Sequence, residues 1–303
     1  MISNSKTIYT RALLFVLAVT FTQYALAQKK IAVENSVFWE VTGNGLSQPS
    51  YLFGTFHLLS HRYVDSLTNV TNKFTTAKTI VSELLIDSTM TMKMMASAQM
   101  KGTTLNKLLT PEQFKQTNDW LHELSGYDLT MFNGMNPMTI EILLMTMMQQ
   151  KYFPLDPGQD VVMDLYFQQR GTRDKKQVIG LETFDEQTHA IFGQFTYERQ
   201  AQLLTTAVKK RNTAEEELRN MNRFYREGNL GKLEALMYDE MYTAAETAVM
   251  LDNRNKKWMQ QLPGLFKQQP TFVAVGAMHL AGENGLVTLL RKEGYTVKPI
   301  QTK

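Results

Sequence analysis

Cysteine is absent from the 303-residue sequence. The chain therefore has no disulfide bonds, no thiol nucleophile and no thiolate ligand for zinc. Any metal ion must be held by histidine, carboxylate or amide groups. The absence of cysteine thus restricts the chemistry of an active site to a short set of side chains.

A large excess of one charge is also absent. The sequence has 32 basic and 29 acidic residues. Two of the basic residues lie in the first 27 positions, which contain no acid, so that 30 bases face 29 acids in the rest of the chain. Nucleic acids and anionic membrane surfaces attract strongly basic proteins. We therefore do not expect either of them as a partner.

No stretch beyond the N-terminus approaches the roughly 20 uncharged apolar residues that a membrane span needs. The N-terminus itself has Lys6 and Arg11, the apolar run 12–21 and then Ala25-Leu26-Ala27. This is the pattern of a secretory signal peptide that is cleaved after Ala27, and the apolar run is too short for a membrane anchor. We expect residues 1–27 to be a signal peptide and the mature protein to be exported, periplasmic or secreted, without a membrane span.

Long tracts of proline, glycine or serine are absent too, which argues against disorder. Apolar residues make up 43% of the chain and aromatic residues 10%, enough for a large core. Residues 28–303 are near the upper length that one core supports. We expect them to form a single domain with an insertion.

Six short segments have the apolar and β-branched composition of strands, and helical periodicity fills most of the intervals. The predicted strands are 36–41, 50–53, 79–86, 177–181, 271–275 and 296–300, and the predicted helical regions are 64–77, 88–171, 182–262 and 283–293. This alternation indicates an α/β fold with a central, largely parallel or mixed sheet flanked by helices, in which about 88–171 is a helical insertion. Chemistry is then expected at the C-terminal ends of the strands.

The sequence Gly-x-x-His-Leu occurs twice, each time after an apolar strand, at Gly54–Leu58 and at Gly276–Leu280. The glycine allows a sharp exit from the strand, and His57 and His279 can then project into a shared crevice. A neutral imidazole there can bind a divalent metal or act as a general base. One such histidine is more often structural, but the repetition favours a functional site.

These and other segments resemble the TraB/GumN family, which includes the Tiki proteases and is distantly similar to erythromycin esterases and haem-binding ChaN-like proteins. The matching segments are Phe38-Trp39-Glu40-Val41, Tyr51-Leu52-Phe53-Gly54-Thr55-Phe56-His57, Gly180-Leu181-Glu182-Thr183, Glu186-Gln187, Arg254-Asn255-Lys256-Lys257-Trp258 and Val275-Gly276-Ala277-Met278-His279-Leu280-Ala281-Gly282. The resemblance implies a metal-dependent, peptidase-like site that uses the two histidines, acidic residues and an arginine.

Three charged residues are candidates beside the histidines. Glu83 lies in an apolar segment, where a carboxylate can bind a metal, orient a histidine or act as a general base; the alternative is a structural salt bridge. Glu182 follows another strand, with Glu186 four residues later, and helix capping is the alternative for both. Composition alone places Arg254 on a solvated helix face. The family resemblance gives it a role in holding a substrate carboxylate or an oxyanion.

The other histidines and the many methionines receive no catalytic role. We expect surface positions for His61, His122 and His189. The methionines have helical spacing, which favours packing within the insertion over copper binding.

The leading hypothesis is an exported metal-dependent hydrolase. In it His57 and His279 bind Mn, Co or Zn, and Glu83 or Glu182 assists the attack of water on a peptide or on a small ester or amide. The alternative is a non-catalytic binding protein that holds a peptide or a haem in the same cleft.

Overall fold

The computed structural model describes residues 35–57, 59–237 and 241–303. The predicted signal peptide, residues 1–27, and Leu58 of the first motif lie outside the described residues. Within these ranges no helix has both the length and the apolar character of a membrane span.

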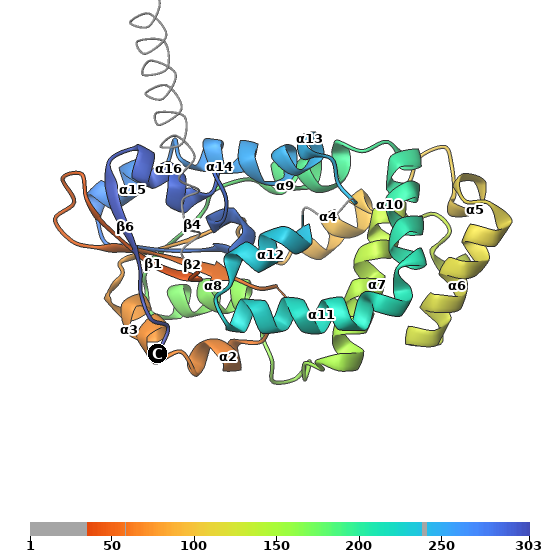
Figure 1. Cartoon of the computed structure of the whole chain (residues 1–303), viewed down its shortest axis with the longest axis horizontal. Helices are drawn as coiled ribbons and strands as arrows, with labels where there is room; N and C mark the ends of the chain where they lie inside the picture. Colours follow the sequence, from red (N-terminus) through yellow and green to blue (C-terminus); the bar gives the residue numbers. More distant parts are fainter. Residues whose placement is uncertain (1–34, 58, 238–240) are drawn as a thin grey trace, which may run out of the picture. The chain divides into compact units, whose positions relative to one another are not determined.

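Six strands form one mixed sheet in the order β4-β3-β5-β2-β1-β6 (Figure 1). The strands are β1 (Phe38–Gly43), β2 (Ser50–Thr55), β3 (Thr79–Ser82), β4 (Gln177–Gly180), β5 (Thr271–Gly276) and β6 (Tyr295–Pro299). The pairs β3–β4, β3–β5 and β2–β5 are parallel, whereas β1 runs antiparallel to both β2 and β6. The predicted α/β fold with a largely parallel, mixed sheet is therefore confirmed.

The hairpin between β1 and β2 turns where the sequence signal predicts it. Gly43, Asn44 and Gly45 all have positive φ, at 79°, 46° and 80°, a conformation that glycine and asparagine adopt most readily. The second strand of the hairpin is fully buried, as is its parallel neighbour β5. A continuous apolar strand at the centre of the sheet is thus covered on both faces.

Helices cover both sides of the sheet and form a second body beside it. They are α2 (His61–Asp65), α3 (Thr68–Thr76), α4 (Met90–Ser97), α5 (Leu105–Leu108), α6 (Pro111–Ser125), η1 (Leu129–Phe132), α7 (Pro137–Tyr152), α8 (Met163–Arg173), α9 (Phe184–Thr188), η2 (His189–Gly193), α10 (Tyr197–Lys209), α11 (Arg211–Arg226), α12 (Leu230–Met237), α13 (Ala244–Thr247), η3 (Ala248–Asp252), α14 (Asn253–Trp258), α15 (Leu262–Gln268), η4 (Ala277–Leu280) and α16 (Leu286–Lys292). The helices α3 and α8 lie on one side of the sheet, and α14, α15 and α16 lie on the other (Figure 1).

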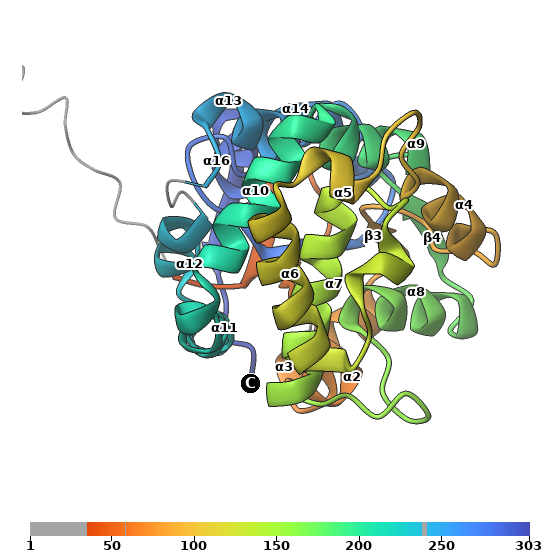
Figure 2. The same ribbon diagram turned by 90° about the vertical axis from the view of Figure 1, so that its right-hand side faces the viewer.

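The apolar core has two large parts. One lies around the sheet and includes Phe53, Phe167 and Trp258. The other holds together α5, α6, α7, α10 and α11 through side chains such as Leu121 and Leu144, and Figure 2 shows this helical body from its outer side. The segment 88–171 contributes to both parts, because α8 packs against the sheet while α5 to α7 pack against one another.

One predicted strand is shorter than its apolar sequence. The segment 79–86 was expected to be a strand throughout, but β3 ends at Ser82. Its last paired residue, Ser82, lies opposite Gly180 of β4 and Ala274 of β5. Leu85 and Ile86 are exposed at 43% and 42%. Glu83 therefore lies just past the strand end and not within the strand.

Candidate active site at the carboxyl ends of the strands

The two Gly-x-x-His motifs lie side by side on parallel neighbours. Gly54 pairs with Val275 and Thr55 with Gly276 across β2 and β5. A Cβ atom on Gly54 would lie 2.8 Å from Cα of Ala277, a distance that real Cβ atoms do not adopt. Glycine at this position therefore lets the chain that carries His279 pass directly over β2.

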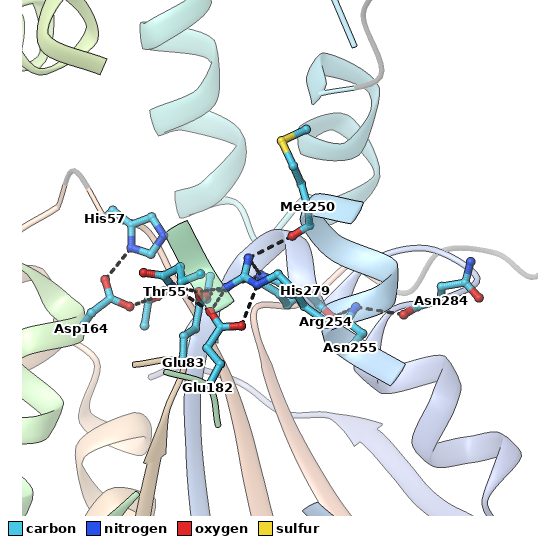
Figure 3. Close-up of polar contacts among 12 residues, drawn as sticks. Thr55, His57, Glu83, Asp164, Glu182, Met250, Arg254, Asn255, His279 and Asn284 are labelled. Atoms are coloured by element: carbon cyan, nitrogen blue, oxygen red, sulfur yellow. Dashed lines mark hydrogen bonds and ion pairs between the residues drawn. The ribbon is translucent and has the colours of Figure 1, made fainter. Parts of the chain in front are cut away.

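Figure 3 shows that the five predicted site residues lie together at one edge of the sheet. His57 follows β2 and Glu83 follows β3. Glu182 follows β4 and His279 lies in η4 directly after β5. Arg254 reaches the same edge from α14. The carboxyl ends of the parallel strands thus bring together residues that lie far apart in the sequence.

Arg254 connects both predicted carboxylates with one of the histidines. Its guanidinium donates to Glu83 Oε2 at 2.6 Å, and to both carboxylate oxygens of Glu182 at 2.6 and 3.0 Å. It also donates to the Met250 carbonyl oxygen at 2.9 Å and to His279 Nε2 at 3.0 Å. The arginine side chain is only 11% exposed. Its position on a basic, hydrophilic helix segment gave no sign of this burial.

Glu83 is held in its ionised form. Burial raises its pKa, but the Arg254 guanidinium, the charge of His57 and a backbone hydrogen bond outweigh burial, and the net shift of its pKa is downward. The backbone hydrogen bond comes from Gly276 N, 2.7 Å from Glu83 Oε1. Gln187 donates to Glu83 at 3.2 Å and to Glu182 at 3.0 Å. Both carboxylates are therefore paired in a buried network.

His279 is a buried, neutral imidazole with a defined tautomer. The side chain of Asn255 fixes the ring: Nδ1 of His279 donates to Oδ1 of Asn255 at 2.7 Å, and the amide of Asn255 donates to the backbone oxygens of His279 and Asn284. Burial lowers the pKa of His279. Trp258 packs against the ring at a centroid distance of 4.3 Å. These contacts direct the lone pair of Nε2 toward Arg254 and the site.

His57 is paired with a carboxylate that the sequence did not reveal. Its Nδ1 lies 2.7 Å from Asp164 Oδ2, and Thr55 donates its hydroxyl to the other oxygen of Asp164 at 2.6 Å. The charge of Asp164 raises the pKa of His57 to about 9. The His57 side chain is 64% exposed, so solvent weakens this pairing. The other ring nitrogen, Nε2, lies near Gly276 at the end of β5.

The side chains of the site surround Gly276 closely. A Cβ atom at this position would be 3.1 Å from Glu83 Oε1, 3.4 Å from His57 Nε2 and 3.7 Å from the His279 ring. A small cavity of about 150 Å³ lies beside them and is lined by His57, Glu83, Asp164 and Gln187, among others. Glycine at position 276 thus lets the two histidines and one carboxylate approach the same point of the main chain.

The remaining candidates lie outside this cluster. Glu186 accepts a hydrogen bond from the backbone N–H of Thr183 at 2.8 Å, forming a capping box for α9, and also pairs with Lys257. His122 and His189 are exposed. His61 accepts a hydrogen bond from the backbone N–H of Val161 at 3.2 Å. These four residues have structural or surface positions.

Sequence reasoning missed Asp164 and the role of Asn255. Asp164 lies in the first turn of α8, where an acid is the ordinary partner of the helix dipole. Asn255 lies next to Arg254 within a segment that matched the family. Both residues act through tertiary contacts with chain segments far away in the sequence. No local pattern distinguishes such contacts from ordinary helix positions.

Comparison with known proteins defines the family. The model of the TraB/PrgY/gumN family matches residues 37–299. The chain belongs to this family. It is also 22% identical over 321 residues to the protein named Metalloprotease TIKI2 from Danio rerio, an alignment that covers 87% of this chain. The chain spans 61% of the length of that relative. No solved structure matches this member of the TraB/PrgY/gumN family.

Proposed function

We propose that this protein is an exported, metal-dependent hydrolase with peptidase-like activity. The observation that carries the proposal is the convergence of His57, Glu83 and His279 around Gly276. Membership of the TraB/PrgY/gumN family and the similarity to a protein named as a metalloprotease support a hydrolytic reaction.

The donors around Gly276 suit a divalent ion in kind. Imidazole nitrogen and carboxylate oxygen are ordinary ligands of Mn, Co and Zn. Among the residues that the structure describes, no three such side chains are already arranged as a complete ligand set. Arg254 donates to Nε2 of His279, so its guanidinium must leave this nitrogen before the nitrogen can bind a metal. The four hydrogen bonds of Arg254 to other groups do not require His279.

The chemistry of the site follows from this assignment. When bound by His57 and His279, a divalent ion would increase the acidity of a water molecule at the site. Asp164 and Asn255 orient the two imidazoles through Nδ1. Each Nε2 could then bind the ion once His57 has lost its proton and Arg254 has moved off His279. Glu83 is placed to accept a proton from water, because it is ionised and lines the small cavity beside His57.

Arg254 and Glu182 prepare the site for a polar substrate. The bidentate pairing with Glu182 fixes the plane of the guanidinium. In this position Arg254 is suited to stabilise the oxyanion that forms when water attacks a carbonyl group, or to hold a substrate carboxylate. We propose a peptide, or a small ester or amide, as the substrate, and a periplasmic or secreted location for the mature protein.

The proposal is tested with the mature protein purified without chelator, beside the His57→Ala/His279→Ala double variant. Metal content is measured by elemental analysis, and cleavage is measured on a mixed peptide library with Mn, Co or Zn. We expect near-stoichiometric metal and metal-dependent cleavage in the wild type, and loss of both in the double variant with an unchanged circular dichroism spectrum. A wild type that binds none of the three metals and cleaves nothing would favour the binding-protein alternative, and a haem Soret band would identify that ligand.

A further inference from the structure

A second cavity, of about 620 Å³, lies away from the carboxylate cluster. It is bounded by the start of α2, by the end of α7 with the loop that follows, and by the end of α11. We call it the Arg226 pocket and define it by Arg62, Tyr63, Gln149, Tyr152, Phe153 and Arg226. The hydrolase chemistry proposed above uses none of these residues.

Gln149 presents an unsatisfied acceptor in this pocket. The residue is 3% exposed. Its Nε2 donates to the Phe153 carbonyl oxygen at 2.9 Å, and this bond fixes which end of the amide is the oxygen. Oε1 has no hydrogen-bond partner within the described part of the chain. A buried acceptor without a partner is unfavourable, so a ligand N–H or O–H group that reaches Oε1 would form a stabilising hydrogen bond there.

Arg226 contributes an unneutralised positive charge. Its guanidinium lies over the Tyr63 ring, 4.6 Å from the centroid, and no acidic group among residues 35–57, 59–237 and 241–303 forms an ion pair with it. Arg62, in contrast, is held by Asp160 at 3.0 Å and by Gln159 at 2.8 Å. The free guanidinium favours a carboxylate ligand.

Aromatic side chains form the apolar part of the pocket. Tyr63, Tyr152 and Phe153 line it together with Pro154 and Leu155. Rings in this arrangement offer a large apolar contact area to a flat or branched side chain. The pocket thus combines the unpaired charge of Arg226, the Arg62–Asp160 ion pair, the Gln149 acceptor and an apolar wall.

The walls of the pocket are continuous with the candidate active site. Residues 59–61 pair with residues 161–163 through a Ser60–Val162 bridge and a hydrogen bond from the His61 N–H to the Val161 carbonyl oxygen at 2.7 Å. The same two segments lead to His57 on one side and to Asp164 on the other. A ligand in the pocket therefore contacts the segments that hold the His57–Asp164 pair.

We propose that the Arg226 pocket is a subsite for an acidic segment of the peptide substrate. A carboxylate of the peptide pairs with Arg226, a peptide N–H donates to Gln149 Oε1, and an adjacent apolar side chain packs against Tyr63 and Tyr152. The assignment to a substrate rests on the proposed hydrolase function, whereas binding of such a ligand does not.

The test compares two small probes by calorimetric titration: N-acetyl-L-phenylalanine and its amide, which has the same ring and N–H but no carboxylate. We expect the acid to bind about tenfold more tightly than the amide, because a guanidinium–carboxylate pair is the difference between them. Arg226→Gln should remove this preference, and Gln149→Leu should weaken both probes. Arg223→Gln is the matched control, since this arginine is also exposed on α11 but stacks over Phe224.

Equal affinity of the two probes, or a preference that survives in Arg226→Gln, overturns the proposal. If Gln149→Leu fails to fold by circular dichroism, the Arg226→Gln result decides alone. Titration of the His57→Ala/His279→Ala variant separates the two proposals. If the probes still bind to this variant but the wild type cleaves nothing, the hydrolase proposal fails and binding at the Arg226 pocket stands. In an active enzyme the acid should raise the KM for peptide cleavage; unchanged cleavage with bound probe rules out a substrate subsite.

Discussion

At the scale of single residues, Arg254 has the most connected position in the described site. Two carboxylates, a carbonyl oxygen and an imidazole nitrogen all accept hydrogen bonds from this one guanidinium. A buried ion pair contributes little net stability compared with an apolar pair, but removal of one partner leaves an uncompensated charge in the interior. Loss of Arg254 should therefore destabilise the protein more than loss of an ordinary surface arginine.

Arg254→Met should lower the free energy of unfolding at pH 7 by about 3–5 kcal/mol, because Glu83 and Glu182 then remain buried without their cation. Urea denaturation followed by circular dichroism measures the change. Arg219→Met is the control, since Arg219 is 54% exposed and pairs with Glu215 one helical turn away; there we expect a loss below about 0.5 kcal/mol. Equal losses in the two variants would contradict the role of Arg254 as the counter-charge of the site.

The residue scale also shows where sequence reasoning stops. His57 and His279 were predictable because their motif is repeated after two apolar strands. Asp164 and Asn255 were not, since each has the residue type and position expected in an ordinary helix. Arg254 was predictable only through the family resemblance. Local patterns thus identify groups at strand ends, whereas the side chains that orient them depend on packing between distant segments.

At the scale of secondary-structure elements, the glycines set how closely the strands and the segments after them approach. The main chain of Ala277 lies over Gly54, and the short helix η4 that carries His279 begins there. The sequence predicted the strands well because their apolar runs are continuous. It placed the end of β3 too late, because the apolar run continues past the last paired residue.

Gly54→Ala should destabilise the protein by about 1–3 kcal/mol, because the added Cβ collides with Ala277 and forces a backbone shift. The displacement of η4 should also reduce any activity that depends on His279. Gly264→Ala in α15 is the matched substitution, since a Cβ there meets nothing within 4 Å; it should stabilise by about 0.5–1 kcal/mol. Thermal denaturation of both variants gives the comparison, and a Gly54→Ala protein as stable as wild type would refute the close approach.

At the scale of the whole molecule, a sheet body and a helical body are built from interleaved parts of the chain. The segment 88–171 supplies helices to both. Fold class was predictable from the alternation of strands and helices. Strand order was not, because it depends on pairing between segments that lie far apart in the sequence. The parallel pairing of β2 with β5 is what converts two separate motifs into one site.

Ligand binding at this site should be visible in global stability. An ion present at 100 times its dissociation constant stabilises the native state by about 2.7 kcal/mol, which corresponds to a rise in Tm of roughly 5–10 °C for a protein of this size. Differential scanning calorimetry with Mn, Co or Zn should show the rise in wild type and its reversal by chelator. The His57→Ala/His279→Ala variant should show none; a similar rise in that variant would mean that the metal binds elsewhere.

The strand order has a consequence for the timing of activity. β5, the fifth strand in the sequence, lies between β3 and β2, which are made early. Until it inserts, the sheet is two separate halves, with His57 on one and Glu83 on the other, and neither His279 nor its supporting glycine is in place. A growing chain thus carries no complete candidate site. The proposed activity would therefore begin only when β5 has closed the centre of the sheet.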